Sequence, residues 1–399
     1  MKPIRLHFRL ALVYFLVAAL FGLALRGFGV FDLPGKYRFL VHTHSHIALL
    51  GWVYLALTTL IYHAFLHSSS IRARYHRLFL FTQLTLLGML LSFPFHGYAF
   101  WSILFSTLFL LASYGYFAFF LSNSRADQRK APGFRLVRAS LIYMVLSSLG
   151  PWALGGIMNT LGPESAWYRL AIYFYLHFQY NGWMVLALAG LGLHLAGKRG
   201  IGLLPKRFET GFWLLQSGII LSFFLSTLWM EPPGVFYVIG GLGALLQLAG
   251  FLYIGSALWV GLRQRFNGWA LHRLLVFVLV LFGVKLLLQA LSALPAFATL
   301  IAGNIDYIIG YLHLTFLGIL TPALWLLGKS QRIIRLPVGG TGVFLLGFVL
   351  SELLIFLRGS QGWLNFSVPL DFSQWIFYTS LLMVLGILWI ITCQWPRSH

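Results

Sequence analysis

The 399-residue sequence contains few charged residues, only 9% of the chain, and a single cysteine, Cys393. Soluble domains carry roughly 25% charged residues, so this scarcity argues against a separate soluble domain. One cysteine excludes an internal disulfide, and also a Cys-x-x-Cys-His haem attachment, a thiolate copper site and an iron–sulfur cluster. Any metal bound by this chain must therefore be held mainly by histidine.

Acidic residues are also scarce, since eight Asp and Glu oppose 28 Lys and Arg to give a net charge of +20. The distribution of these charges excludes a nucleic-acid partner. With the N-terminus inside the cell, most basic residues fall at the inner ends of apolar runs, as the positive-inside rule requires. The outer ends carry only five basic residues: Arg26, Lys36, Arg38, Arg169 and Arg358. We therefore predict an N-in, C-in chain whose basic inner face attracts anionic membrane lipid.

Hydrophobic residues make up 59% of the chain. They form runs long enough to cross a hydrocarbon core of ~30 Å. These runs predict an all-α integral membrane fold, a single polytopic domain over 1–399 and a multi-pass location in a bacterial inner (cytoplasmic) membrane. We expect twelve transmembrane helices, near 8–26, 38–66, 77–98, 99–121, 134–158, 169–196, 208–230, 235–262, 269–293, 305–327, 336–358 and 372–395.

One pattern occurs three times: a histidine followed five residues later by a glycine, at 46–51, 177–182 and 313–318. Each copy lies within an apolar run, about four runs from the next. This spacing predicts three pseudo-repeated arcs of four helices. Because histidine is costly in hydrocarbon unless it finds a partner, repeated intramembrane histidines indicate a functional site.

Topology places His177 and His313 about eight residues into their spans, roughly 12 Å deep in the outer half of the membrane. The run His42-Thr-His44-Ser-His46 lies in the same leaflet, and His96 closes its span at the outer surface. In this run the first and third histidines share a helix face, whereas His44 points nearly the opposite way. The three histidines of this run therefore cannot all bind one metal ion while the segment is helical. The other histidines lie at inner helix ends, in inner loops or in the tail, and we interpret them as interfacial polar residues.

Two chemistries suit these histidines. Two neutral imidazoles from different helices are the usual way to hold a low-spin haem, whereas three or more converging imidazoles suit copper. His177, His44, His96 and Tyr180 are the candidates for a second, copper-like site. Side chains that share a stripe with His177 or adjoin His313 are candidate site-lining residues: Tyr173, Tyr180, Asn181 and Tyr311.

Two ionisable residues lie within apolar spans, Lys285 and Glu352. Such residues are expensive in a membrane and mark functional sites or internal partners. We interpret them as a pair, equally consistent with a proton or ion element and with an internal salt bridge.

The chain resembles the catalytic subunit of haem–copper oxidases and nitric oxide reductases. Arg38-Phe-Leu-Val-His42-Thr43 is similar to that family's Arg-x-x-x-His-Thr-Asn, and residues 310–315 (Gly-Tyr-Leu-His-Leu-Thr) are similar to its Gly-His-Phe-His-Leu-Thr. The resemblance implies that His42 and His313 ligate one low-spin haem. It also places His177 at a copper-ligand position and Arg358 where propionate-binding arginines lie.

The sequence departs from that family at its oxygen-reducing centre. Tyr311 replaces the histidine that ligates the high-spin haem, and the adjacent histidine pair of span seven is absent from 212–217. The resemblance thus implies a degenerate member that keeps only the low-spin haem. NnrS-like haem- and copper-containing membrane proteins, linked to nitric oxide stress, are a second resemblance, through His42-Thr43-His44.

These observations predict a haem b-binding membrane protein, with a low-spin bis-histidine haem between span two and span ten. His42 is the expected ligand from span two, with His46 as the alternative, and His313 comes from span ten. The expected role is electron transfer or redox sensing, related to nitric oxide or respiration, with a separate protein as electron donor. The alternatives are a transporter of a small molecule or ion and an unusual terminal oxidase or nitric oxide reductase.

Overall fold

The computed structural model describes residues 2–66, 68, 70–265, 269–367 and 371–395. Within these ranges the regular elements are all helical and no strand occurs. The chain folds into two compact units. Unit 1 combines Met1–Ser124 with Phe316–His399, and unit 2 is the contiguous segment Arg125–Thr315. Unit 1 is therefore built from both ends of the sequence.

Eleven helices of the described chain are long and apolar enough to cross a membrane, which indicates a multi-pass membrane protein. They agree with eleven predicted spans and run over Pro3–Gly27, Tyr37–Leu66, Arg72–His96, Phe100–Asn123, Pro132–Thr160, Pro205–Met230, Val235–Ser256, Ala270–Leu291, Ile305–Ser330, Val338–Leu364 and Phe372–Thr392. The span predicted at 169–196 is helical but is not among the eleven. Its polar side chains, including His177 and Asn181, lower its apolar character.

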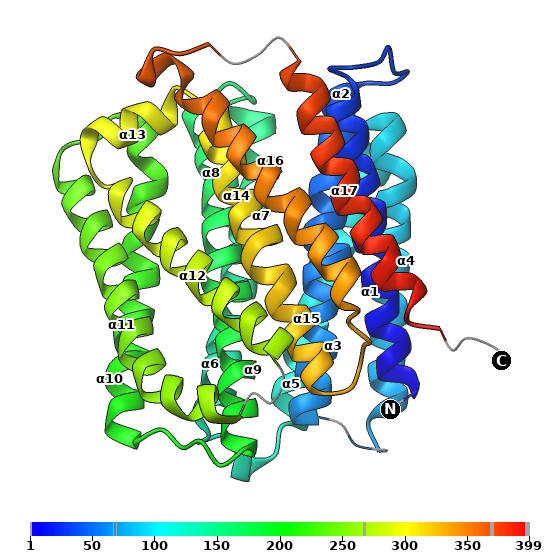
Figure 1. Cartoon of the computed structure of the whole chain (residues 1–399), viewed down its shortest axis with the longest axis vertical. Helices are drawn as coiled ribbons and strands as arrows, with labels where there is room; N and C mark the ends of the chain where they lie inside the picture. The colour runs from blue at the N-terminus through cyan, green and yellow to red at the C-terminus, as the bar shows by residue number, and fades with distance from the viewer. Residues whose placement is uncertain (1, 67, 69, 266–268, 368–370, 396–399) are drawn as a thin grey trace. The chain divides into compact units, whose positions relative to one another are not determined.

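Unit 1 is a bundle in which the first and last helices of the chain lie side by side (Figure 1). Helix α1 packs against α17 and against the segment from α2 to α3, while α4 packs against α2 and α5. The elements are α1 (Lys2–Gly27), α2 (Tyr37–His46), η1 (Ile47–Tyr54), α3 (Leu55–Ile61), η2 (Tyr62–Leu66), α4 (Arg72–His96), α5 (Phe100–Asn123), α15 (Thr321–Ser330), α16 (Val338–Leu364) and α17 (Phe372–Thr392).

The core of unit 1 is aromatic and surrounds Trp52 of η1. The Trp52 ring stacks on Phe15 with 4.9 Å between centroids, and its indole N–H donates to the Thr321 hydroxyl at 2.9 Å. Trp325 lies 4.8 Å from Phe344 in the same cluster. Buried aromatic rings contribute large apolar areas, and a buried indole needs a partner for its N–H group. This core therefore fixes η1 against α1 and α15.

The two ends of the described chain meet at one end of unit 1. The Arg9 guanidinium lies 5.4 Å over the Trp395 ring, which brings the start of α1 to the end of α17. Figure 1 shows the start of α1 and the end of α17 at the same end of these two helices. Both helix ends therefore lie on the same side of unit 1, and the assignment of that side to the cytoplasm remains a prediction.

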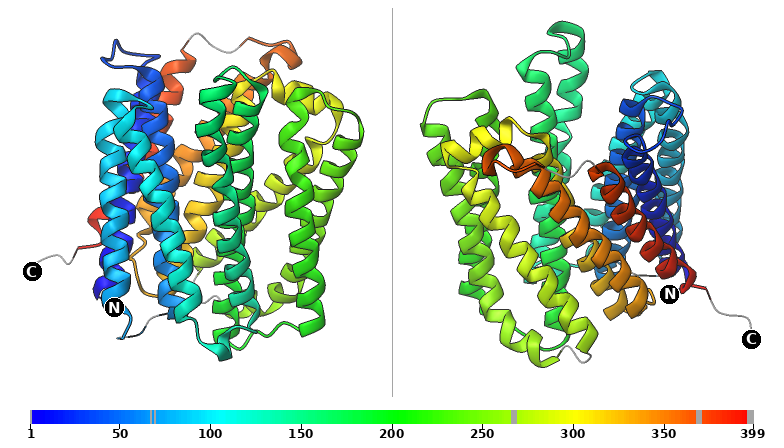
Figure 2. Two further views of the ribbon diagram at one scale, coloured as in Figure 1. Left: turned by 180° about the vertical axis from the view of Figure 1, so that it is seen from behind. Right: turned by 45° about the horizontal axis from the view of Figure 1, so that its top comes forward.

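Unit 2 contains pairs of closely packed helices, among them α6 with α9 and α10 with α11 (Figure 2). A Cβ added to Gly133 of α6 would lie 2.6 Å from the Gly190 carbonyl oxygen of α9, so glycine permits this close approach. The elements are η3 (Ala126–Gln128), α6 (Pro132–Ser147), α7 (Leu149–Thr160), α8 (Ala166–His177), η4 (Phe178–Val185), α9 (Leu186–Lys198), α10 (Pro205–Leu221), η5 (Ser222–Met230), α11 (Val235–Arg265), α12 (Trp269–Leu291), α13 (Pro295–Ala302) and α14 (Ile305–His313).

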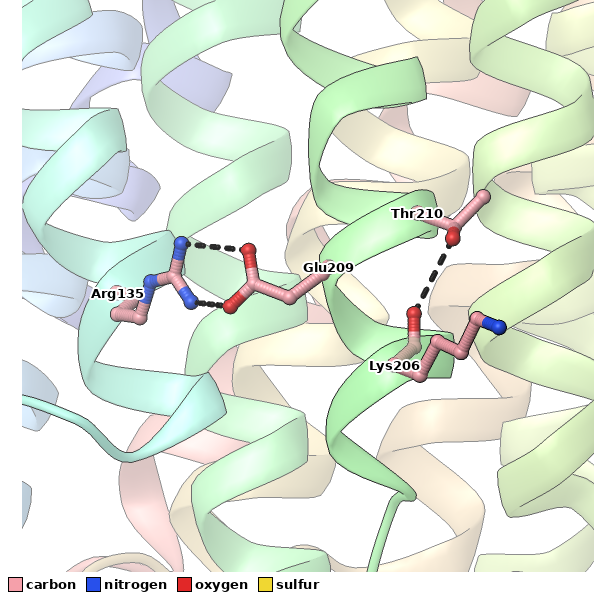
Figure 3. A network of polar contacts seen from close by, with 4 residues as sticks. All are labelled: Arg135, Lys206, Glu209 and Thr210. Atoms are coloured by element: carbon pink, nitrogen blue, oxygen red, sulfur yellow. Dashed lines mark hydrogen bonds and ion pairs between the residues drawn. The ribbon is translucent and has the colours of Figure 1, made fainter.

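An ion pair joins α6 to α10 in unit 2. Arg135 donates to both carboxylate oxygens of Glu209, as the close-up in Figure 3 shows. The same guanidinium lies 5.1 and 4.8 Å from the centroids of the Phe208 and Phe212 rings. Both charged side chains are partly exposed, so this pair orients the two helices more than it stabilises them.

Candidate functional site

Each of the three repeated histidines ends an α-helix at the point where a π-helical segment begins. His46 precedes η1, His177 precedes η4, and His313 precedes η6 (Leu314–Leu320). The π-helix is rare and occurs frequently at functional sites, because its extra residue changes the direction of nearby side chains. The sequence repeat is therefore also a repeat of backbone structure.

In two copies of the repeat, the glycine packs against a tyrosine. A Cβ on Gly51 would lie 2.9 Å from the Cβ of Tyr14, and a Cβ on Gly182 would lie 2.7 Å from the Cβ of Tyr143. In both copies this tyrosine comes from the preceding long helix, α1 in unit 1 and α6 in unit 2. Each glycine thus allows a helix to pack directly on the π-helical backbone.

In unit 1, His42 and His46 share one face of α2 and contact the same aromatic residues. The His46 ring centroid lies 4.4 Å from that of Phe93, and the His42 centroid lies 4.6 Å from that of Tyr98. Phe93 belongs to the end of α4, and Tyr98 follows it. The two imidazoles therefore pack against the same pair of aromatic rings, Phe93 and Tyr98.

The tautomer of His46 is set by the backbone. Its Nδ1 lies 2.8 Å from the carbonyl oxygen of His42, and because a carbonyl only accepts, Nδ1 carries the proton. The lone pair of a neutral imidazole is then on Nε2. Ligating histidines in metal sites almost always donate their other N–H group in this way.

His44 faces a different helix, as the helical spacing predicts. Its Nδ1 lies 2.8 Å from the Ala18 carbonyl oxygen of α1. A Cβ on Gly22 of the same helix would lie 2.9 Å from its Cε1 atom, so the imidazole packs directly on α1. His44 therefore does not join His42 and His46 in one cluster.

The other predicted residues of unit 1 have neighbours of their own. His96 ends α4 with an exposed side chain. Arg358 of α16 lies 4.5 Å over the Phe372 ring. Glu352 is 8% exposed, and the charge of Arg26 acts on its carboxyl group.

In unit 2, His177 is 2% exposed and both of its ring nitrogens are engaged. Nε2 lies 2.9 Å from the Ile219 carbonyl oxygen, so it donates. Nδ1 then accepts from the Asn181 side-chain amide at 3.3 Å. His177 is thus a fully satisfied neutral imidazole in this structure, and binding a metal would require it to give up one of these bonds.

The network continues from Asn181 to Lys285, whose side chain is 1% exposed. The Lys285 ammonium donates to the Asn181 carbonyl oxygen and, at 2.6 Å, to Gln289 Oε1. The Tyr311 hydroxyl donates to the same Gln289 oxygen at 3.4 Å. The chain His177–Asn181–Lys285–Gln289–Tyr311 is continuous and links η4 to α12 and α14.

Two tyrosine rings lie near the middle of this hydrogen-bonded network. The Tyr180 and Tyr311 rings each lie 5.9 Å from Lys285 Nζ. The Tyr173 hydroxyl accepts from Arg169 at 3.2 Å. His313 is half-buried at the end of α14. It belongs to unit 2 and His42 to unit 1, so their pairing around a haem stays a prediction, as does the pairing of Lys285 with Glu352.

Two further buried polar residues were not among the predicted site residues. Gln289 looks like an ordinary amide in an apolar helix, although its position one turn after Lys285 is the signal that could have shown it. His7, which the sequence predicts to be an interfacial polar residue, is 2% exposed, and its ring stacks 3.6 Å from Phe79. In the described chain, neither of its ring nitrogens has a hydrogen-bond partner.

No family model matches this chain, and no curated protein matches it. Among the described residues, no group of three or more His, Cys, Asp or Glu side chains could hold a metal ion. Geometry alone therefore has to indicate which of these residues act together.

Proposed function

We propose that this protein binds one low-spin haem b between span two and span ten, with His46 and His313 as axial ligands. The observation that carries the proposal is the fixed imidazole of His46, whose Nδ1 donates at 2.8 Å to the His42 carbonyl oxygen and leaves the Nε2 lone pair for iron. His46 is preferred to His42 for this reason. A bis-histidine haem supplies reversible one-electron chemistry.

The residues around His46 fit a haem edge. Phe93 and Tyr98 offer flat apolar surfaces beside the imidazole. Arg38 is close enough for its charge to act on His42, and with Arg358 it is a candidate partner for the haem propionates. These side chains would position the group if it is bound.

The proposed role is electron transfer or redox sensing near the outer face of a bacterial inner membrane, related to nitric oxide or respiration. Electrons would come from a separate donor protein. The proposal includes twelve spans in three groups of four, which the three α-to-π junctions and the two glycine–tyrosine contacts support. Copper at His177 is a weaker expectation, because both nitrogens of that imidazole are engaged.

The test is the dithionite-reduced spectrum of the purified protein, with haem content measured as the pyridine haemochrome. The wild-type protein is expected to show sharp low-spin b-type bands. His46→Ala and His313→Ala should each lose these bands, whereas His42→Ala should retain them with a shifted maximum. The exposed His96→Ala is the matched control and should resemble the wild type.

Two results would reject the proposal. One is a featureless spectrum from protein expressed with ample haem. The other is full haem content in both the His46→Ala and the His313→Ala variants. Size-exclusion profiles of all variants separate loss of haem from loss of folding.

A transporter is the second candidate, favoured by the helix break in unit 2. The α-helix stops at Ser148, between α6 and α7, with Pro151 just beyond. Transporters commonly use interrupted helices near their binding sites. Substrate flux into liposomes by haem-free protein would support this function, and oxygen or nitric oxide consumption abolished by His177→Ala would instead support an unusual terminal reductase.

A further inference from the structure

Lys285 is a buried amine held only by neutral acceptors. Its bonds go to the amide oxygens of Asn181 and Gln289, and no carboxylate in the described part of unit 2 forms an ion pair with it. A buried charge is costly unless it is paired, and neutral amides offset only part of that cost. An ammonium at this position therefore has no counter-charge among the described residues of unit 2.

The Lys285 centre has an excess of hydrogen-bond donors. Gln289 is 6% exposed, and its Nε2 has no hydrogen-bond partner among the described residues. Lys285 carries three N–H donors and uses two of them. The oxygen of the same Gln289 carboxamide accepts from Lys285, so the unused N–H groups belong to a side chain that the ammonium already contacts. A buried unpaired donor costs free energy, so a partner is expected here.

We propose that the Lys285 centre is a binding site for one small monovalent anion, such as nitrate or chloride. The anion accepts from the Lys285 ammonium and from Gln289 Nε2. Tyr180 and Tyr311 bound the site with ring faces 5.9 Å from Nζ and shield it from water. In this low-dielectric setting, the attraction between the ammonium and an anion is much stronger than in water.

The chemistry of the site excludes other ligand classes. A metal cation would be repelled by the ammonium, and both amide oxygens near it already accept hydrogen bonds. A water molecule could accept from the same donors but would leave the charge unpaired. The site does not depend on haem binding, because its residues are separate from the proposed axial ligands.

The test compares thermal unfolding of the purified full-length protein in sodium gluconate, sodium chloride and sodium nitrate at equal ionic strength. Gluconate is too large for a site bounded by two rings, so chloride or nitrate should raise the melting temperature. Lys285→Met should remove this difference and reduce binding of radiolabelled chloride in equilibrium dialysis by about tenfold or more. Lys329→Met, at the inner end of α15, is the control and should bind chloride as the wild type does.

Gln289→Glu provides an internal carboxylate at the same position. It should stabilise the protein in gluconate and abolish chloride binding, because the carboxylate takes the place of the anion. The proposal is overturned if the wild type binds no chloride and melts at one temperature in all three salts. It is also overturned if Glu352→Gln removes the difference in melting temperature between the salts and Lys285→Met does not. Glu352 would then be the counter-charge.

Discussion

Gly182 and Gly192 belong to one continuous helical segment, yet they have different surroundings. A Cβ on Gly182 would lie 2.7 Å from the side chain of Tyr143, whereas a Cβ on Gly192 would have no atom within 4 Å. The first glycine is required by packing against α6, and the second is not. This difference gives the repeated glycine a role that can be measured.

We predict that Gly182→Ala destabilises the protein by about 1–3 kcal/mol, because overpacking forces Tyr143 or the backbone to move. Gly192→Ala should be neutral or stabilising by up to about 1 kcal/mol, because alanine favours a helix. Thermal unfolding of both variants in the same detergent measures the difference. Equal stability of the two variants would mean that the glycine of the repeat has no packing role.

At the residue scale, the sequence predicted the helix faces of the histidines better than the hydrogen-bond partners of Lys285. Four-residue spacing correctly placed His42 and His46 on one face and His44 on another. The partners of Lys285 could not be predicted, because Asn181 lies 104 positions away and is brought near only by the packing of unit 2. Within unit 2 its partners are amides, and the pairing with Glu352 of unit 1 stays a prediction.

At the scale of elements, the π-helical segments are the feature that the sequence did not reveal. One extra residue in a helical turn hardly changes the hydropathy of an apolar run. The sequence therefore predicts plain helices over 38–66 and 305–327. The repeated glycine was a hint, since it allows the close approach of α1 to η1 at Tyr14. The change of hydrogen bonding after each histidine follows only from the folded backbone.

We predict that deleting Leu49 from η1 is strongly destabilising. Without a change of helix type, the deletion would turn later residues by about 100° relative to His46. Trp52 would then lose its stacking on Phe15 and its bond to Thr321, at a cost of about 3–5 kcal/mol. Unfolding temperature and monodisperse yield are the measurements.

Deletion of Asp32, an exposed residue of the loop before α2, is the control for the Leu49 deletion and should be tolerated. If both deletion variants unfold at the wild-type temperature, the extra residue of η1 has no structural role.

At the scale of the whole molecule, the apolar spans were predicted well and the division into units was not. Eleven predicted spans match helices, because burial in lipid imposes long apolar runs that are visible in the sequence. The association of Met1–Ser124 with Phe316–His399 depends on contacts between distant helices such as α1 and α17. Such contacts have no signature in a single sequence.

We predict that the loop containing Glu164 is outside the cell and the loop containing Asp127 is inside, following the positive-inside rule. Both side chains are exposed, Glu164 between α7 and α8 and Asp127 in η3 before α6. In a Cys393→Ser background, Glu164→Cys should react with a membrane-impermeant maleimide on intact cells. Asp127→Cys should react only after the membrane is opened, and the reverse pattern would show the opposite orientation.

The composition of unit 1 has a consequence for synthesis of the chain. Unit 2 is contiguous, so all of its helices leave the ribosome in succession. Helix α1 packs against α17, which is made after all of unit 2. Helix α1 must therefore wait, with one face covered by lipid or by a membrane chaperone, until α17 has been made.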